Sequence, residues 1–465
     1  MKVFIFILLC YIPLPCLAQK KPPAKIKARL MRSDKKEIDF KVGTTDKQIW
    51  TISPEVKPDK LQVECGKSGT ILKFISDRDS ITFLVKEGDV ICFNILLNNK
   101  DTAQTEVSGI PQNVKFSNAY IAAHRHKIEV EIPEVHELVN IALALTDVGL
   151  KDSNMVAMNT AYYQEVVKKF GQFKKHPLIV AMNAQLNNPD QNESYWWYYS
   201  WKMNACAFEF RNGKIVNNGI IRNMGFNHPE NPIPSHTLLL QSFAAQTGFR
   251  QFYKAHILYY DTLNKLYRSL NPIDRMQGWL EKTFHRQYGN YSVYFSPLVG
   301  GAHATQRYAD NGFSQTAMFV CAARMETSTN RSVNEMLESR IVFTEIDHNF
   351  VNPVTDNHLA EVKRVFGNRA KWVDDAKKGT GGYTNEESVF NEYMTWAVYS
   401  LYCIDNFKET DYEVMLKNME SQMERSRGFI RFKGFNRQLI KLYKDDKKVT
   451  VDELYKNIIV WCGQM

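Results

Sequence analysis

Residues 344–348 read Thr344-Glu345-Ile346-Asp347-His348, and this stretch keeps two of the three functional positions of a zinc-binding helix motif. In the intact motif, His-Glu-x-x-His, two imidazoles one helical turn apart bind Zn²⁺ and the Glu activates a water molecule. Here Thr344 stands where the first His is required. A Thr hydroxyl is a poor zinc ligand, so the stretch supplies one metal ligand, His348, and one candidate general base, Glu345.

The pattern around this stretch predicts a helix that presents both groups on one face. A capping box at residues 332–335 marks the start of the helix, and Pro353 predicts that the helix ends by that residue. At about 100° per residue, Glu345 and His348 lie about 60° apart, and Thr344 lies one turn before His348. A metal ion bound to His348 would therefore lie beside Thr344, with Glu345 close to a bound water.

A second helix is predicted from about Glu386 to Ile404, and after Ser388 it carries a single charged residue, Glu392. A helix that is apolar on nearly all sides is buried. A buried carboxylate needs a partner, because removing the partner of a buried charge costs roughly 3–5 kcal/mol. Two kinds of partner satisfy this need at the level of sequence: a metal ion, or an Arg or Lys from another helix.

A catalytic zinc site has three protein ligands and keeps a fourth position for water, so a third ligand is required beside His348 and Glu392. His303 is the first choice, because it follows a strand-like run and the pair Gly300-Gly301 shortly before the motif helix. The alternative is that the two glycines form a tight turn and His303 faces solvent. Glu345 itself could also bind the metal, which would remove the base.

The rest of the sequence predicts an α+β chain of several domains. Short alternating or β-branched runs, separated by turn residues, fill residues 28–130 and predict a β-sandwich-like accessory domain. Over residues 131–465 the apolar residues recur mostly at helical spacing. Two strand-like runs, 291–297 and 316–322, interrupt this pattern, so we expect a mainly helical domain with a small sheet.

The first residues have the pattern of a cleaved signal peptide. Lys2 precedes the apolar run from Val3 to Leu9, and Cys16-Leu17-Ala18 is a small-x-small cleavage site before Gln19. This predicts a signal peptide over residues 1–18, cut after Ala18, and therefore a secreted or periplasmic protein. The basic, proline-containing residues 19–27 predict a linker.

Composition argues against two classes of function. The formal charge is +9, but the 59 basic residues are spread along the chain without a dense tract, so we expect no nucleic-acid partner. No segment after the signal reaches the length of a membrane-spanning helix. Six cysteines follow the signal, with no Cys-x-x-Cys pair. Cys65 with Cys92 is the most plausible disulfide, and free buried thiols are the alternative.

Three segments together resemble a known family. Residues 345–353, residues 296–301 and the pair Asn391-Glu392 are similar to a family of secreted bacterial proteins, the domain-of-unknown-function family 4932. The core of that family resembles gluzincin zinc metallopeptidases, so the resemblance implies a zincin-like helical domain. It covers roughly residues 135–460, including the closing Arg427-Gly428-Phe429. Typical members have an intact His-Glu-x-x-His followed by Asn-Pro, and Thr344 departs from that pattern.

The resemblance implies roles for three residues: Glu345 as general base, His348 as second metal ligand and Glu392 as third, with zinc as cofactor and a peptide or protein as substrate. The first functional hypothesis is therefore a secreted zinc-dependent, peptidase-like hydrolase in which His303 replaces the missing ligand. The alternative is a catalytically inactive, peptidase-like binding protein of the cell envelope. The partner of Glu392 distinguishes them, because an arginine bound to that carboxylate counts against the hydrolase.

Overall fold

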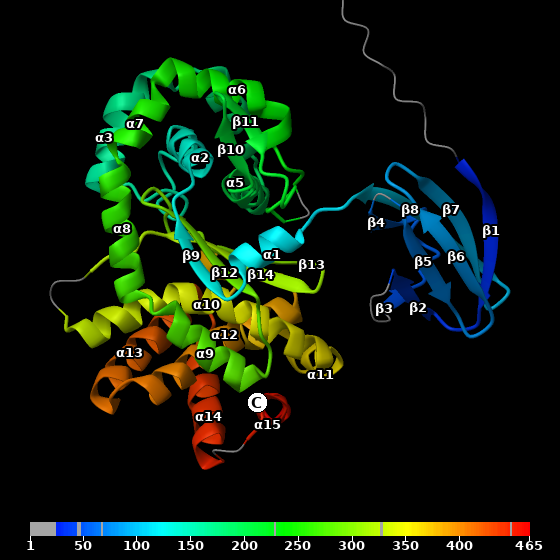
Figure 1. Ribbon diagram of the computed structural model, residues 1–465. Coiled ribbons are helices and arrows are strands. Elements are labelled where there is room, and N and C mark those ends of the chain that lie inside the picture. Colours follow the sequence, from blue (N-terminus) through cyan, green and yellow to red (C-terminus); the bar gives the residue numbers. More distant parts are fainter. Residues whose placement is uncertain (1–24, 44–47, 67, 227–228, 326–328, 447–448) are drawn as a thin grey trace, which may run out of the picture. The chain divides into compact units, whose positions relative to one another are not determined.

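The computed structural model describes residues 25–43, 48–66, 68–226, 229–325, 329–446 and 449–465. It contains about 50% helix and 22% strand, which confirms the predicted α+β class. The chain divides into two compact units, Met1–Asn113 and Val114–Met465 (Figure 1). The predicted signal peptide and residues 19–24 of the predicted linker lie outside the described residues, whereas residues 25–27 begin the first strand.

The first unit is built from two four-stranded sheets that enclose one hydrophobic core. Along β6 exposed and buried residues alternate, because successive side chains of a strand point to opposite faces. The sheets have the orders β1-β7-β8-β4 and β3-β2-β5-β6. Their strands are β1 (Lys25–Ser33), β2 (Glu37–Val42), β3 (Gln48–Thr51), β4 (Asp59–Cys65), β5 (Thr70–Ile75), β6 (Ser80–Val85), β7 (Val90–Leu97) and β8 (Asp101–Pro111).

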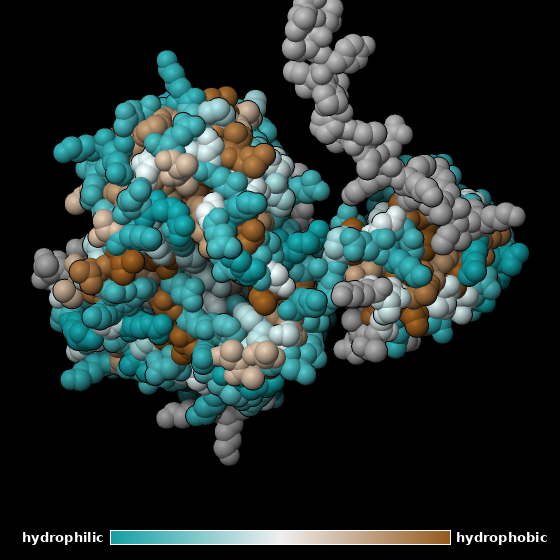
Figure 2. All heavy atoms as spheres, turned by 45° about the horizontal axis from the view of Figure 1, so that its top comes forward, coloured by the Kyte–Doolittle hydropathy of each residue, from teal (hydrophilic) through white to brown (hydrophobic). Residues whose placement is uncertain are grey.

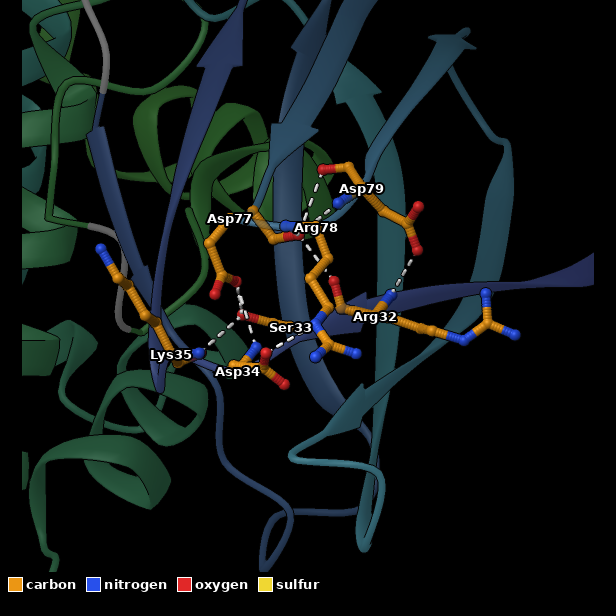
Figure 3. Close-up of polar contacts among 8 residues, drawn as sticks. Arg32, Ser33, Asp34, Lys35, Asp77, Arg78 and Asp79 are labelled. Carbon is orange, nitrogen blue, oxygen red and sulfur yellow. Dashed lines mark hydrogen bonds and ion pairs between the residues drawn. The ribbon is translucent and has the colours of Figure 1, made fainter.

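Two turns of the first unit are joined by polar contacts (Figure 3). The turn after β1 presents Ser33 Oγ and the Asp34 N–H, and both donate to Asp77 Oδ1 over 3.1 Å. Asp77 lies in the turn between β5 and β6. The Arg32 N–H donates to Asp79 Oδ2 over 2.9 Å in the same region. Because β1 belongs to one sheet and β5 and β6 to the other, these contacts fix the two sheets to each other.

The second unit has one four-stranded sheet in the order β13-β14-β12-β9. β12 (Asn290–Ser296) pairs in parallel with both β9 (Lys127–Glu131) and β14 (Phe313–Cys321), and β13 (Ala304–Asp310) is antiparallel to β14. The accessory domain predicted from the sequence runs to residue 130 and therefore includes most of β9. Its partner in the structure is β12, more than 150 residues away, so it belongs to the sheet of the second unit.

Fifteen α-helices lie in the described residues, all in the second unit, beside the small hairpin β10 (Phe208–Arg211) and β11 (Lys214–Asn217). α10 contacts β13 and β14 on one side and α12 on the other (Figure 1). The helices are α1 (Asn118–His124), α2 (Glu134–Ala144), α3 (Ala161–Phe170), α4 (Pro177–Leu186), α5 (Gln191–Ala205), α6 (Ile233–Thr247), α7 (Phe249–Ala255), α8 (Ile257–Leu270), α9 (Ile273–Phe284), α10 (Arg331–Asn357), α11 (Leu359–Phe366), α12 (Glu386–Asn406), α13 (Glu409–Ser421), α14 (Phe432–Asp445) and α15 (Val451–Gly463).

The motif helix, α10, continues four residues beyond Pro353, so the prediction that it ends by that residue is wrong. Proline lacks the N–H that would bond the carbonyl four residues earlier, which here is Asn349 O. The Tyr288 hydroxyl donates to Asn349 O over 2.6 Å. This side chain comes from the loop before β12 and satisfies the carbonyl that the proline leaves without a donor.

The described cysteines form no disulfide bonds. All six cysteines of the described residues are free, so Cys65 and Cys92 are not joined and the alternative of free thiols holds. In the view of Figure 2 the surface is mainly hydrophilic, with hydrophobic residues in separate small groups. Within the described part of the chain, no helix has an apolar stretch of the length needed to span a bilayer.

Candidate functional site

The motif residues lie on α10, which begins at an Asn330 cap and is buried along much of its length. Glu345 is half-buried, and the side chain of His348 is 23% exposed. Thr344 is 7% exposed, and its hydroxyl donates to Ile341 O of the same helix over 3.1 Å. The hydroxyl of Thr344, at the first motif position, therefore donates its proton to the helix backbone.

Glu392 lies on α12 and is 3% exposed, as the apolar surroundings in the sequence predicted. Its partner is a cation of the protein: Arg427, the last residue of the π-helical turn Gln422–Arg427, forms an ion pair with Glu392 Oε1. Trp396 Nε1–H donates to the same oxygen over 2.8 Å. Burial alone would raise the pKa of Glu392, but Arg427 and His348 outweigh it and hold the pKa below its usual range.

The structure also brings His348 to Glu392. His348 Nε2 lies 3.7 Å from Glu392 Oε2, the oxygen that Arg427 leaves free. The other ring nitrogen, Nδ1, faces Asn352 Oδ1 at 3.4 Å. Burial lowers the pKa of His348 and outweighs Glu392 and Asn352, which raise it. Two of the three expected metal ligands therefore meet, and one of them is already paired.

His303 precedes β13 in a loop that two glycines hold against residues 153 and 154. A Cβ on Gly300 would lie 2.4 Å from the backbone oxygen of Ser153, so only glycine fits there, and one on Gly301 would lie 2.4 Å from Asn154 Oδ1, so that side chain would have to move. His303 is half-buried, and its Nε2 lies 3.1 Å from Gly300 O. This contact makes Nε2 the protonated nitrogen, so Nε2 has no lone pair for a metal.

The described residues bring together fewer ligands than a catalytic zinc ion requires. A catalytic zinc needs three protein ligands in addition to a water, and the described residues bring only His348 and Glu392 to one point. Within these residues no group of three or more His, Cys, Asp and Glu side chains is arranged to hold a metal ion. The Thr344 hydroxyl donates to a backbone carbonyl, and His303 Nε2 does the same, which leaves Nδ1 as the one ring nitrogen of His303 with a lone pair. As arranged, the described donors do not complete a catalytic zinc site.

A buried lysine lies next to the motif. Lys202 on α5 is fully buried, and its Nζ donates to Ala302 O, directly before His303. Burial lowers the pKa of Lys202 to about 7, with Glu345 acting in the opposite direction. Burial, and then Glu392, raise the pKa of Glu345 to about 8, while Lys202 and Arg427 lower it. As arranged, Glu345 therefore carries a proton at neutral pH, whereas a general base must be ionised.

Three cations act on His303: Lys202, Arg427 and Arg340, a half-buried residue of α10. Sequence reasoning did not single out Lys202 or Arg340, and it assigned no role to Arg427. Arg427 stands in the Arg-Gly-Phe segment that supported the family resemblance, and the need of Glu392 for a partner was recognised without identifying it. Lys202 directly follows the aromatic run 195–201. A single lysine at the end of such a run is the signal that could have identified it. No sequence signal distinguishes Arg340 from other helix-surface arginines.

No family model matches the chain, and neither a curated protein nor a solved structure matches it. The resemblance to family 4932 therefore remains a prediction that depends on the residues quoted for it.

Proposed function

We propose that this chain is an exported, peptidase-like binding protein of the bacterial cell envelope that holds its ligand without hydrolysing it. In this proposal the signal peptide directs export, the first unit is a β-sandwich-like accessory domain, and the second unit carries the binding site. The observation that supports it is the ion pair between Arg427 and Glu392. A guanidinium occupies one oxygen, Oε1, of the carboxylate that would otherwise bind a metal, and a buried ion pair of this kind is costly to break.

The state of the remaining motif groups agrees with this proposal. Thr344 has replaced a ligand, Glu345 has a pKa of about 8, and His348 is the single firm donor on α10. Each change alone would weaken hydrolysis. Together they leave a half-buried polar site with binding groups but without the ionised base and the full ligand set that hydrolysis requires.

The test restores the missing ligand. Purified mature wild-type protein is expected to contain zinc well below one equivalent by elemental analysis, and Thr344→His is expected to gain about one equivalent, because three ligands then converge. Thr344→Ala serves as the matched control and should stay metal-free. Wild-type protein that retains one equivalent of zinc after dialysis, and loses it in His348→Ala, would overturn the proposal.

One distance favours a second candidate, a variant zinc hydrolase. Two ligands bonded to a tetrahedral zinc at 2.0–2.1 Å lie about 3.3–3.5 Å apart, and His348 Nε2 and Glu392 Oε2 are separated by 3.7 Å. A carboxylate ligand whose second oxygen accepts a hydrogen bond from an outer residue is common in metal sites. The same elemental analysis separates the two candidates, together with mass spectrometry of peptides incubated with the protein.

A further inference from the structure

Two cations near His303 have no ion-pair partner among the described residues. Arg340 on α10 places its guanidinium carbon 4.5 Å from the centre of the Trp396 ring, and Arg427 places its own 4.8 Å from the same ring. Arg427 is neutralised by Glu392. Arg340 forms no hydrogen bond or ion pair with another described residue, although a guanidinium has five N–H donors. One half-buried guanidinium beside the candidate site is therefore unpaired within the described chain.

Lys202 adds a second cation without an acid partner. Its Nζ donates to Ala302 O and lies 4.9 Å from the Tyr198 ring and 5.1 Å from the Tyr199 ring. No carboxylate of the described residues forms an ion pair with it. Tyrosine faces and a carbonyl attract an ammonium, but they carry no formal charge that could neutralise it.

The acids near these cations do not pair with Arg340 or Lys202. Glu392 is paired with Arg427, and burial keeps a proton on Glu345 at neutral pH. On α10 itself, Glu338 is the acid that acts on Arg340, and one of its oxygens accepts the Arg324 N–H over 2.9 Å. His303 is neutral, because burial together with Lys202 and Arg340 lowers its pKa to about 3. Arg340 therefore has no hydrogen-bonded or ion-paired acid among the described residues, and its N–H groups can receive an anion.

We propose that this site binds the C-terminal carboxylate of a peptide, with Arg340 as the guanidinium that receives it and Lys202 as the second cation. The inference rests on the proposed binding function and names its ligand. A guanidinium matches a carboxylate because two parallel N–H groups can donate to its two oxygens. The peptide is favoured over an acidic polysaccharide because the receiving guanidinium is single and half-buried against the Trp396 ring. A peptide end presents one carboxylate to one guanidinium, whereas a polyuronate presents its charges along its side.

The experiment compares peptides that differ only in this charge. N-acetylated pentapeptides are prepared with a free C-terminal carboxylate and as C-terminal amides, and their binding to the mature full-length protein is measured by calorimetry. The free acids should bind about 10- to 100-fold more tightly than the amides, which is the range for a charge-assisted hydrogen-bonded pair. Arg340→Gln should remove this difference, and Arg340→Lys should retain part of it.

Arg125 provides the matched control. Its guanidinium also lies over an aromatic ring, 5.7 Å from the centre of Phe313, in the same unit and outside the site. Arg125→Gln should leave the preference for free acids unchanged. Circular dichroism and thermal melting establish that each variant is folded before binding is compared.

The outcomes separate the two proposals. Cleavage of the peptides, seen by mass spectrometry, overturns the binding function. Equal affinity for acids and amides, no binding of any free acid at about 1 mM, or an unchanged preference in folded Arg340→Gln overturns the carboxylate assignment and leaves the binding function standing. Binding of oligogalacturonate in place of the peptides overturns the choice of a peptide.

Discussion

One fully buried carboxyl group in the described part of this protein has no hydrogen-bond partner. Asp347, between the two motif residues, is fully buried, and neither of its carboxylate oxygens has a hydrogen-bond partner among the described residues. Burial, and then Glu392 and Glu345, raise the pKa of Asp347 well above its usual value. The folded protein therefore keeps a proton on Asp347 that the unfolded chain releases above about pH 4.

This burial predicts the effect of an uncharged substitute. Asp347→Asn should raise the free energy of unfolding by about 1–3 kcal/mol at pH 7, because unfolding of the wild type is favoured by releasing that proton. Since the folded pKa is raised, the contribution of Asp347 to stability is complete below pH 4 and is lost as pH rises. The gain from the substitution should therefore shrink as pH is lowered from 7 to 4.

Urea denaturation at several pH values measures this difference. Asp356→Asn, an exposed position on the same helix, serves as the control and should change the free energy of unfolding little at any pH. A gain for Asp347→Asn that stays constant between pH 4 and pH 7 would contradict the assignment of a proton to Asp347.

Among the elements, α10 and α12 carry the site, and α10 depends on a contact from outside itself. Its last turn continues past Pro353 because the Tyr288 hydroxyl takes the place of the absent N–H at Asn349 O. The same tyrosine packs its ring against Phe350 with the ring centres 5.2 Å apart. The end of the helix is therefore specified jointly by Pro353 and by Tyr288, which lies 65 positions earlier in the sequence.

A double-mutant cycle tests this joint specification. Tyr288→Phe should lower the free energy of unfolding by about 1–2 kcal/mol, because it leaves a buried carbonyl without a donor. Pro353→Ala restores an N–H at the helical position, so the loss caused by Tyr288→Phe should be smaller in the Pro353→Ala background. Thermal or urea unfolding of the four proteins gives the coupling energy, and a value near zero would show that the tyrosine does not replace the proline's missing donor.

For the whole molecule, the two units have separate hydrophobic cores. The core of the first unit uses buried residues of both its sheets, and the turn contacts of Ser33 and Asp77 lie within it. Nothing in its sheet pairing requires a strand from the second unit. A single domain of this size buries enough surface to fold alone.

We therefore expect residues 19–113 to fold when produced separately. They should unfold cooperatively in urea, with a slope of about 1 kcal/mol per M for so small a domain, and their circular dichroism should be that of a β-protein. Ser33→Ala should lower the unfolding midpoint, because it removes one of the contacts between the sheets. A chain that is unfolded without denaturant would contradict the independence of the two cores.

The fold was predictable where the information is local. The buried helix around Glu392 and most strands of the first unit were predicted from spacing and turn residues, and the structure contains them. Pairings between distant segments were not predictable, as β9 with β12 illustrates. β13 was missed because a short polar strand after two glycines resembles a loop.

The site was predictable in part for the same reason. Helical spacing placed Glu345 and His348 on one helix, and the need to compensate a buried charge required a partner for Glu392. The identity of that partner, Arg427, depends on how a distant π-helical turn packs, which no local pattern contains. Lys202 and Arg340 are single residues whose importance comes only from what surrounds them.

The free thiols can be used to measure local unfolding of each unit. Cys65 lies in the core of the first unit, and Cys206, Cys403 and Cys462 lie in that of the second. Burial raises the pKa of each of these thiols, so alkylating reagents cannot attack them in the closed state. The rate at which each is labelled therefore gives the free energy of the local fluctuation that exposes it, unit by unit, without any engineered probe.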